Sequence, residues 1–118
     1  GVLIKENHIA SAGGIASVMA QASKLAPSLP SQIEVETLEQ LQEAIAAGAK
    51  LILLDNFDIA GLREAVAITA RRAELEASGG INLESVRAIA ETGVDRISIG
   101  SLTKDIHAVD LSLRFVGR

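Results

Sequence analysis

Short runs of β-branched residues and Leu alternate along the chain with longer segments of helical period, and this alternation limits the possible folds most strongly. The short runs are VLIKE (2–6), IEVE (33–36), KLILLD (50–55), AELEAS (73–78) and RISIG (96–100). Helices are predicted between them, at about residues 14–25, 38–47, 59–72 and 83–92. Strands that are each followed by a helix or loop predict parallel βα units with right-handed crossovers.

Local signals bound several of these segments. Asn82 is expected to cap the last predicted helix and Gly93 to stop it, while Gly48 ends the second. The glycines of AGGIAS (12–17) are expected to start a helix, because the segment lacks the preceding strand of a dinucleotide fingerprint. The closing DLSLRF (110–115) alternates apolar and polar residues, which predicts one more strand with a wet face.

The strands themselves alternate between apolar and acidic residues, which helps to choose between an open doubly wound sheet and an arc of a (β/α) barrel. Ile33 and Val35 point one way while Glu34 and Glu36 point the other. A doubly wound sheet has helices on both faces and needs near-continuous apolar strands, so the barrel is favoured. A complete barrel takes about 250 residues. We therefore expect this chain of 118 residues to form an α/β partial, TIM-like barrel.

The composition argues against several classes of partner. A net charge of −4 and only two Phe, with no Trp or Tyr, leave neither a basic patch nor stacking residues for nucleic acid. No apolar run approaches the roughly 20 residues of a membrane span, and Lys5 and Glu6 stand where a signal peptide would have its apolar centre. The absence of Cys excludes disulfides and thiolate metal sites. A cytoplasmic protein without nucleic-acid or membrane partners is expected.

Polar residues interrupt the apolar strands on one side of the predicted barrel, mostly at one end: Lys5, Asn7, Glu34, Glu36, Asp55, Glu74, Glu76 and Ser78. Dehydrating an ion costs several kcal/mol, whereas a whole domain is stable by only about 5 to 15 kcal/mol. The carboxylates must therefore be hydrated, protonated, ion-paired or facing a cation. Because catalytic groups collect at the C-terminal mouth of a barrel, we interpret the polar ends as the wall of a site.

A structural role stays open for each of these residues taken singly, because ion-pair networks also place charges in sheets. Glu34 and Glu74, one layer deeper than Glu36 and Glu76, are candidates for pairing with Lys5 or with an Arg that is absent from this chain. For His8 a hydrogen-bonded loop position is the simpler interpretation. With only His107 as a second histidine, no zinc site is expected.

Two glycine-containing segments are candidates for phosphate binding. ASGG (77–80) follows a predicted strand and opens a predicted helix, an arrangement that aims backbone N–H groups at an anion. ISIGSLTK (97–104) brings Gly100 and Ser101 to the end of the next strand, with Lys104 nearby. Each signal is weak alone, but the last βα loops of a barrel are a common place for phosphate.

The segments LIKENHI, IEVE, LILLDNF, LEASGGI, ETGVDRISIGSLTK and DLSLRF, in this order, resemble the C-terminal barrel of the quinolinate phosphoribosyltransferases, also called carboxylating nicotinate-nucleotide pyrophosphorylases. The resemblance covers practically the whole chain. It implies a pentosyltransferase of NAD biosynthesis that joins quinolinate to 5-phosphoribosyl 1-diphosphate with Mg²⁺, releasing pyrophosphate and CO₂ to give nicotinate mononucleotide.

The resemblance also implies roles for individual residues. Lys5 matches a lysine that contacts the phosphoribosyl and substrate anions, and Glu36 and Asp55 match the acidic pair that faces the ribose and Mg²⁺. The loops that hold the ribose 5-phosphate correspond to Ser78, Gly79, Gly100 and Ser101. Lys104 lies at a position where family members vary, and it is expected to contact the phosphate from the same loop.

The resemblance further implies that the chain, residues 1–118, is the C-terminal part of the barrel domain, without the N-terminal domain and first barrel units that carry the quinolinate clamp. A homodimer or higher homo-oligomer is expected, because family active sites are completed across subunits, and the isolated chain is expected to be inactive. Two alternatives stay open: a phosphoribosyltransferase-like relative associated with molybdenum transport, and a non-catalytic half-barrel that binds phosphate or assembles with a partner.

Overall fold

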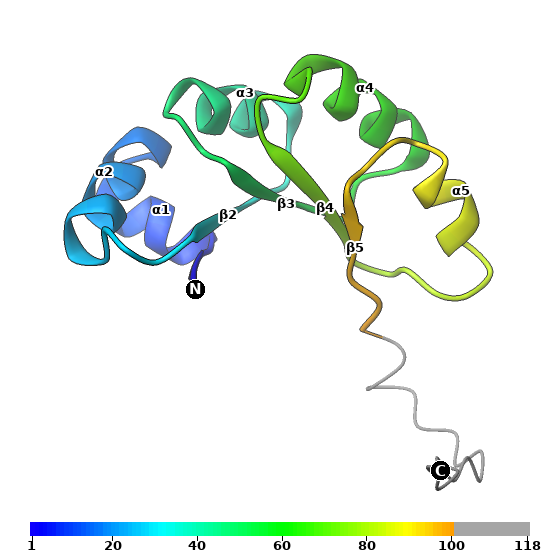
Figure 1. Ribbon diagram of the computed structural model, residues 1–118, viewed down its shortest axis with the longest axis horizontal. Coiled ribbons are helices and arrows are strands. Elements are labelled where there is room, and N and C mark those ends of the chain that lie inside the picture. The colour runs from blue at the N-terminus through cyan, green and yellow to red at the C-terminus, as the bar shows by residue number, and fades with distance from the viewer. Residues whose placement is uncertain (101–118) are drawn as a thin grey trace, which may run out of the picture.

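The computed structural model describes residues 1–100 as five parallel strands joined by helices (Figure 1). The strands are β1 (Val2–Ile4), β2 (Ser31–Val35), β3 (Leu51–Asp55), β4 (Glu74–Ser78) and β5 (Arg96–Ile97). The helices are α1 (Glu6–Ala12), α2 (Ile15–Leu25), α3 (Leu38–Ala46), α4 (Ile59–Thr69) and α5 (Val86–Ala90). The strand predicted at 110–115 lies outside the described residues.

The sheet has the strand order of a barrel arc. Its order is β1-β2-β3-β4-β5, so each strand pairs in parallel with its neighbour along the chain. The helices α2 to α5 lie along one side of this sheet and follow its curvature (Figure 1). A doubly wound sheet would reverse its strand order and carry helices on both faces. The predicted partial barrel is therefore confirmed over the described residues.

The core lies between the sheet and the helices, as the alternation in the strands predicts. Ile33 and Val35 are fully buried, whereas Glu34 between them is half-buried on the other face and Glu36 is exposed. The same holds on β4, where Leu75 and Ala77 belong to the core. At about 25 cal/mol per Å², burial of these Ile, Leu and Val side chains supplies the main driving force for folding.

The chain between β1 and α2 differs from the prediction. Its first polar residues form α1 instead of continuing the strand, and Lys5 becomes the residue before that helix. The backbone N–H of Lys5 donates to Nδ1 of His8 over 3.1 Å, so His8 is a helical residue and not a loop residue. Gly13 ends α1 in a left-handed conformation and Gly14 precedes α2, which confirms that these glycines border a helix start.

Two later helices are shorter than predicted. α4 ends at Thr69 because Ala70 and Arg71 take positive φ angles of 47° and 63°. α5 begins only at Val86, because Asn82 Oδ1 accepts from the N–H groups of Glu84 and Ser85 in a turn that precedes the helix. The predicted cap thus organises a turn and does not start the helix directly.

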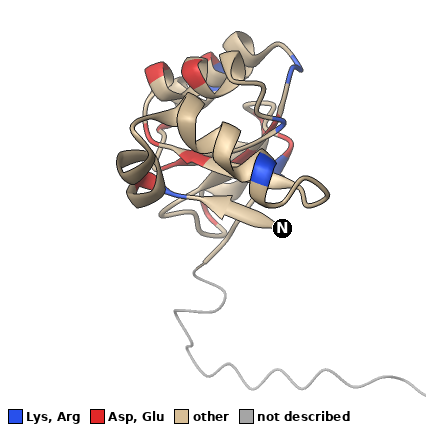
Figure 2. Ribbon diagram, turned by 90° about the vertical axis from the view of Figure 1, so that its left-hand side faces the viewer, with Lys and Arg blue, Asp and Glu red and all other residues tan. Residues whose placement is uncertain are grey.

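None of the helices within residues 1–100 combines the length and the apolar character needed to span a membrane. Lys and Arg occur on several elements of the described fold (Figure 2).

Candidate active site

The carboxyl ends of β2, β3 and β4 bring three of the predicted site residues to one edge of the sheet. Asp55 and Ser78 close β3 and β4 and are partners in the strand register. Glu36 follows directly after β2, whose last residue Val35 pairs with Leu54. Parallel strands place their carboxyl ends at the same edge, so the sheet itself assembles the site.

Local hydrogen bonds fix the position of Glu36. Its N–H donates to Oε1 of Gln40 over 2.7 Å, while Oγ1 of Thr37 accepts from the N–H of Gln40 over 3.2 Å. This is a variant of the capping box at the start of α3. It holds the residue between strand and helix and leaves the Glu36 side chain free to face solvent.

Glu34, Glu36 and Asp55 form a carboxylate cluster. One oxygen from each lies within 4.8 Å of the others, although Glu34 and Asp55 are half-buried and Glu36 is exposed. Three like charges this close repel one another. The cluster is therefore a place where a cation or a positively charged reacting centre would be stabilised.

Burial raises the pKa of Glu34 above its ordinary value of 4.5, and the neighbouring Asp55 carboxylate raises it further. Lys5 acts in the opposite direction and lowers the pKa of Glu34, which places the Lys5 ammonium within electrostatic range of the cluster. Lys5, which lies between β1 and α1, thus supplies positive charge beside the acidic group.

Backbone packing closes the site between β3 and β4. Asn56, with a φ of 61°, donates its N–H to the carbonyl oxygen of Ser78 over 2.9 Å. Gly79, at a φ of 92°, lies so close that a Cβ there would come within 2.9 Å of Asn56 Oδ1 and 3.0 Å of Asp55 Oδ1. Only glycine fits this position.

Further polar side chains lie on the same face of the sheet, nearer the amino ends of the strands than Asp55 and Ser78. Glu76 Oε2 accepts from Nε2 of Gln32 over 2.8 Å, and its Oε1 accepts from Oγ of Ser98. The Ser98 hydrogen bond lowers the pKa of Glu76, partly offset by burial, and Gln32 lowers it further. Glu74, two residues nearer the start of β4, forms an exposed ion pair with Arg96 at 3.2 Å. Both glutamates therefore have structural partners.

The remaining predicted residues are placed less completely. Gly100 lies after β5 at the end of the described residues, and Ser101, Lys104 and His107 lie outside them. The segment from Gly80 to Ser85 separates Gly79 from α5, so the predicted helix start next to ASGG is wrong. Sequence reasoning missed Asn56, although an Asn after a strand is a residue type that favours positive φ.

The donor set of the cluster suits a hard divalent cation. It offers carboxylate oxygens only, and Mg²⁺ is commonly bound through one or two carboxylates together with substrate phosphates and water. Glu36 and Asp55 are the two ligands proposed from the sequence, and the geometry adds Glu34 as their neighbour. A soft or strongly nitrogen-binding metal would find no thiolate and no imidazole in this cluster.

The family model and the curated relatives that match this chain point to the same enzyme family. Residues 1–114 match the family described as "Quinolinate phosphoribosyl transferase, C-terminal domain". A probable carboxylating nicotinate-nucleotide pyrophosphorylase of Bacillus subtilis is 43% identical over 114 residues, covering 96% of this chain and 39% of the relative. The corresponding Mycobacterium leprae protein is 40% identical, with 94% and 40% covered.

Solved structures are also similar to this chain in fold. The nicotinate-nucleotide pyrophosphorylase from Francisella tularensis superposes with a TM-score of 0.85 at 48% identity, covering 88% of this chain and 37% of that one. A thiamine phosphate pyrophosphorylase from Pyrococcus furiosus follows at a TM-score of 0.69 and 27% identity, with 84% and 48% covered. The chain spans about two fifths of the length of the curated relatives described above.

Proposed function

The chain belongs to the quinolinate phosphoribosyl transferase family, whose C-terminal domain it matches, and from this we propose that it forms the phosphoribosyl-transfer site of a carboxylating nicotinate-nucleotide pyrophosphorylase. Such an enzyme condenses quinolinate with 5-phosphoribosyl 1-diphosphate and yields nicotinate mononucleotide, pyrophosphate and CO₂. The names of the bacterial relatives support this activity over the alternative of a molybdenum-transport relative.

The observation that carries the proposal is the placement of Glu36 and Asp55. Their carboxylates come together at the carboxyl ends of adjacent strands, beside the Gly79 backbone and within electrostatic range of Lys5. This edge of the sheet thus presents negative charge, a closely approaching backbone and a cation. A phosphorylated sugar needs all three, because its ring develops positive charge while its phosphates stay anionic.

The residues at this edge of the sheet have separate tasks in the reaction. As pyrophosphate leaves the sugar C1 carbon, positive charge develops on the ring, and the Glu36 and Asp55 carboxylates stabilise it electrostatically. The Lys5 ammonium neutralises substrate anions. Ser78 and Gly79 are proposed to hold the ribose 5-phosphate, with Gly100, Ser101 and Lys104 as further contacts from the next loop.

Mg²⁺ is the proposed cofactor, with Glu36 and Asp55 as its protein ligands. When bound it would neutralise charge on the diphosphate and its leaving group. Glu34 would contribute by its charge, because its carboxylate lies against Asp55. The N-terminal domain with the quinolinate clamp, a homodimer or higher oligomer, and a cytoplasmic location remain predictions from the resemblance and the sequence.

The proposal is tested by calorimetric titration of the chain with 5-phosphoribosyl 1-diphosphate in the presence and absence of Mg²⁺. Binding that requires Mg²⁺ is expected, and Asp55→Asn should weaken it by at least about tenfold, the loss of one charge-assisted contact. Asp58→Asn is a matched control: it removes the same charge three residues away and keeps a good helix cap.

The non-catalytic alternative predicts a different outcome from the same titration. A half-barrel that only assembles with a partner would bind the sugar diphosphate equally in the wild type, Asp55→Asn and Asp58→Asn proteins, or would not bind it. Either result would remove the proposed function. An assay for nicotinate mononucleotide with quinolinate as acceptor then separates this enzyme from the molybdenum-transport relative.

A further inference from the structure

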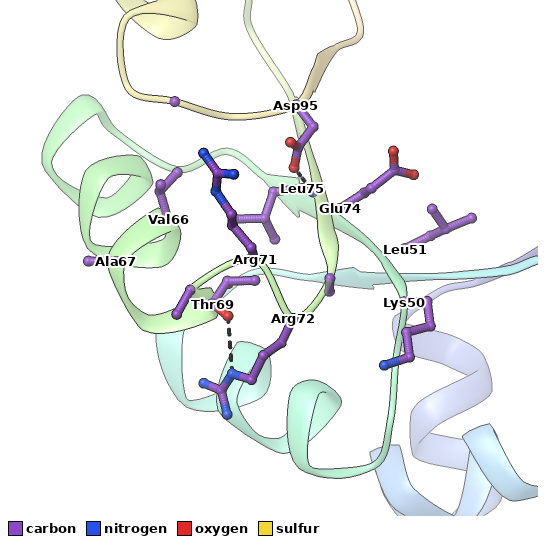
Figure 3. A pocket seen from close by; sticks show the side chains of 13 residues that line it. Lys50, Leu51, Val66, Ala67, Thr69, Arg71, Arg72, Glu74, Leu75 and Asp95 are labelled. Atoms are coloured by element: carbon purple, nitrogen blue, oxygen red, sulfur yellow. Dashed lines mark hydrogen bonds between the residues drawn. The ribbon is translucent and has the colours of Figure 1, made fainter.

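A basic hollow lies at the opposite end of the sheet from the carboxylate cluster. It has a volume of about 980 Å³ and is bordered by the start of β3, the end of α4 and the start of β4 (Figure 3). Leu51 lines it, four residues before Asp55 on the same strand, which separates the two places by about 13 Å at 3.3 Å per residue. The hollow is therefore distinct from the proposed active site.

Three cationic side chains surround this hollow: Lys50, Arg71 and Arg72 (Figure 3). Lys50 and Arg71 form no ion pair with any other residue of the described part of the chain. Two carboxylates, of Glu74 and Asp95, also line the hollow, and each already has a partner. Glu74 pairs with Arg96, and Asp95 Oδ2 accepts from the N–H of Leu75 over 2.8 Å.

Arg72 is held in place by the end of α4. Its Nε donates to the carbonyl oxygen of Thr69 over 3.1 Å, and its terminal nitrogen donates to that of Ile68 over 2.6 Å. A guanidinium carries five N–H donors, so this anchoring leaves donors for a ligand. The anchor also removes most of the side-chain entropy that binding would otherwise cost.

Thr69 gives an independent indication of a ligand. It lines the hollow and is only 1% exposed, and its Oγ1 has no hydrogen-bond partner within residues 1–100. A buried hydroxyl without a partner is disfavoured, and each such group in a folded protein calls for an explanation. An ordered water beneath the Arg71–Arg72 turn would satisfy it and would relay a hydrogen bond to a ligand in the hollow, because Oγ1 itself has almost no accessible surface.

We propose that this basic hollow, lined by Lys50, Thr69, Arg71 and Arg72, is a binding site for a phosphorylated small molecule that carries at least two negative charges. Arginine forks bind phosphate oxygens in pairs, and Lys adds a point charge. The volume is at the upper end of the roughly 300 to 1,000 Å³ common for ligand sites. No aromatic side chain of residues 1–100 lines the hollow, so we expect recognition by charge and not by stacking.

The experiment follows ¹H–¹⁵N NMR spectra of the chain during titration with inorganic pyrophosphate in EDTA, without Mg²⁺. The amides of residues 69–75 are expected to shift in a saturable way, and inorganic phosphate should bind more weakly. Shifts confined to residues 78–80 would place binding in the proposed active site and overturn this proposal. Absence of saturable shifts at millimolar pyrophosphate would also overturn it, whatever the outcome for the proposed function.

Variants make the test specific. Arg71→Gln and Lys50→Gln should each weaken pyrophosphate binding by about tenfold, as expected for one charge-assisted contact. Arg63→Gln is the matched control, since it removes an exposed cation from α4 at a position that does not line the hollow. Equal weakening by Arg63→Gln would show that only net charge attracts the anion, which contradicts a built site.

Thr69→Val separates a binding role from a structural one. Valine has nearly the same shape without the hydroxyl, so the free protein should be as stable as the wild type or more stable, while pyrophosphate affinity falls. Unchanged affinity would remove Thr69 from the site. If Thr69→Val fails to fold, Thr69→Ser keeps the hydroxyl and should retain binding, and the Arg71→Gln result still decides the proposal.

Discussion

Asp55 and Ser78 are register partners at the ends of β3 and β4, and the N–H of Asn56 continues their pairing with a 2.9 Å hydrogen bond to the Ser78 carbonyl. This extra hydrogen bond brings the first residue after β3 against the first residue after β4. Gly79 consequently lies on Asn56 and Asp55. The position of an acidic site residue thus depends on the absence of a side chain on the neighbouring strand.

Gly79→Ala should both destabilise the fold and weaken the site. Its φ of 92° disfavours a side chain, and the added Cβ would meet Asn56 and Asp55 atoms at 2.9–3.0 Å. We expect the free energy of unfolding to fall by about 1 to 3 kcal/mol, as measured by urea denaturation. Mg²⁺-dependent binding of 5-phosphoribosyl 1-diphosphate should fall as well, because Asp55 must move.

Gly80→Ala is the matched control for that change. Gly80 has a similar positive φ of 62°, but its added Cβ would meet only Asn56 Oδ1, at 3.9 Å. It should show backbone strain alone, on the order of 1 kcal/mol, with little change in sugar diphosphate binding. Equal losses for both variants would show that the close contact at Gly79 has no special role.

The parts of this fold that were predictable are those with a simple periodic cause. Alternation in IEVE identified the buried face through Ile33 and Val35, because residues two apart in a strand share a side. The same alternation placed Glu36 on the other face, and Asp55 was identified as the polar end of an apolar strand. The sheet then brought their carboxylates together, as the barrel interpretation required.

The features that the sequence did not predict depend on local backbone conformations and packing, which the residue types alone do not indicate. α4 ends because Ala70 and Arg71 take positive φ values, and neither is a glycine or asparagine. α1 has only seven residues, and just Ile9 and Ala12 among them pack against the core, so its sequence is too short to show a helical period. The unpartnered Thr69 hydroxyl follows from the tertiary structure, since the sequence places Thr69 in an ordinary helical segment.

Glu34→Gln should stabilise the protein at neutral pH. The folded pKa of Glu34 is raised above 4.5, so its protonated form is favoured in the fold, and that stability is lost as the pH rises through the folded pKa. Glutamine removes the cost of holding an ionised carboxylate there. We expect a gain below about 1 kcal/mol at pH 7, because the group is partly solvated, and no gain near pH 4.

Thermal unfolding at pH 4 and pH 7 measures this effect. Glu43→Gln, which removes an exposed carboxylate from α3, should show almost no difference between the two pH values. Saturating Mg²⁺ should shrink the advantage of Glu34→Gln at pH 7, because the cation favours the ionised form. A gain that is equal at both pH values would contradict electrostatic repulsion as its cause.

Glu76→Gln should have the opposite pH dependence. The folded pKa of Glu76 is lowered, first by the Ser98 hydrogen bond, so its stabilisation is present above an unfolded pKa near 4.5 and is lost as the pH falls through the folded pKa. The variant should lose about 1 kcal/mol at pH 7 and approach the wild type below pH 4 in urea denaturation.

Glu74→Gln is the comparison for the Glu76 variant on the same strand. Its carboxylate makes a surface ion pair with Arg96, and its side chain is 51% exposed. Exposed pairs contribute about 0.5 kcal/mol or less, so its removal should be nearly neutral at both pH values. If Glu74→Gln costs as much as Glu76→Gln, the hydrogen bonds from Gln32 and Ser98 are not what stabilises this face.

Mg²⁺ should stabilise the free chain through the carboxylate cluster. The three oxygens within 4.8 Å repel one another when ionised, and a divalent cation relieves this repulsion only in the folded state, where they are held together. At ten times its Kd, Mg²⁺ should add about 1.4 kcal/mol, which raises Tm by about 5 to 10 °C for a domain of this size. EDTA should reverse the shift.

Glu36→Gln and Asp55→Asn should each remove most of that Mg²⁺-dependent rise in Tm. Glu39→Gln provides the control, since it lies in the first turn of α3 and changes the same charge outside the cluster. NaCl at matched ionic strength screens all surface charges equally and should raise Tm much less than Mg²⁺. A rise that persists in Asp55→Asn, or that NaCl reproduces, would mean that the ion acts by screening, and Glu36 and Asp55 would then have no claim as metal ligands.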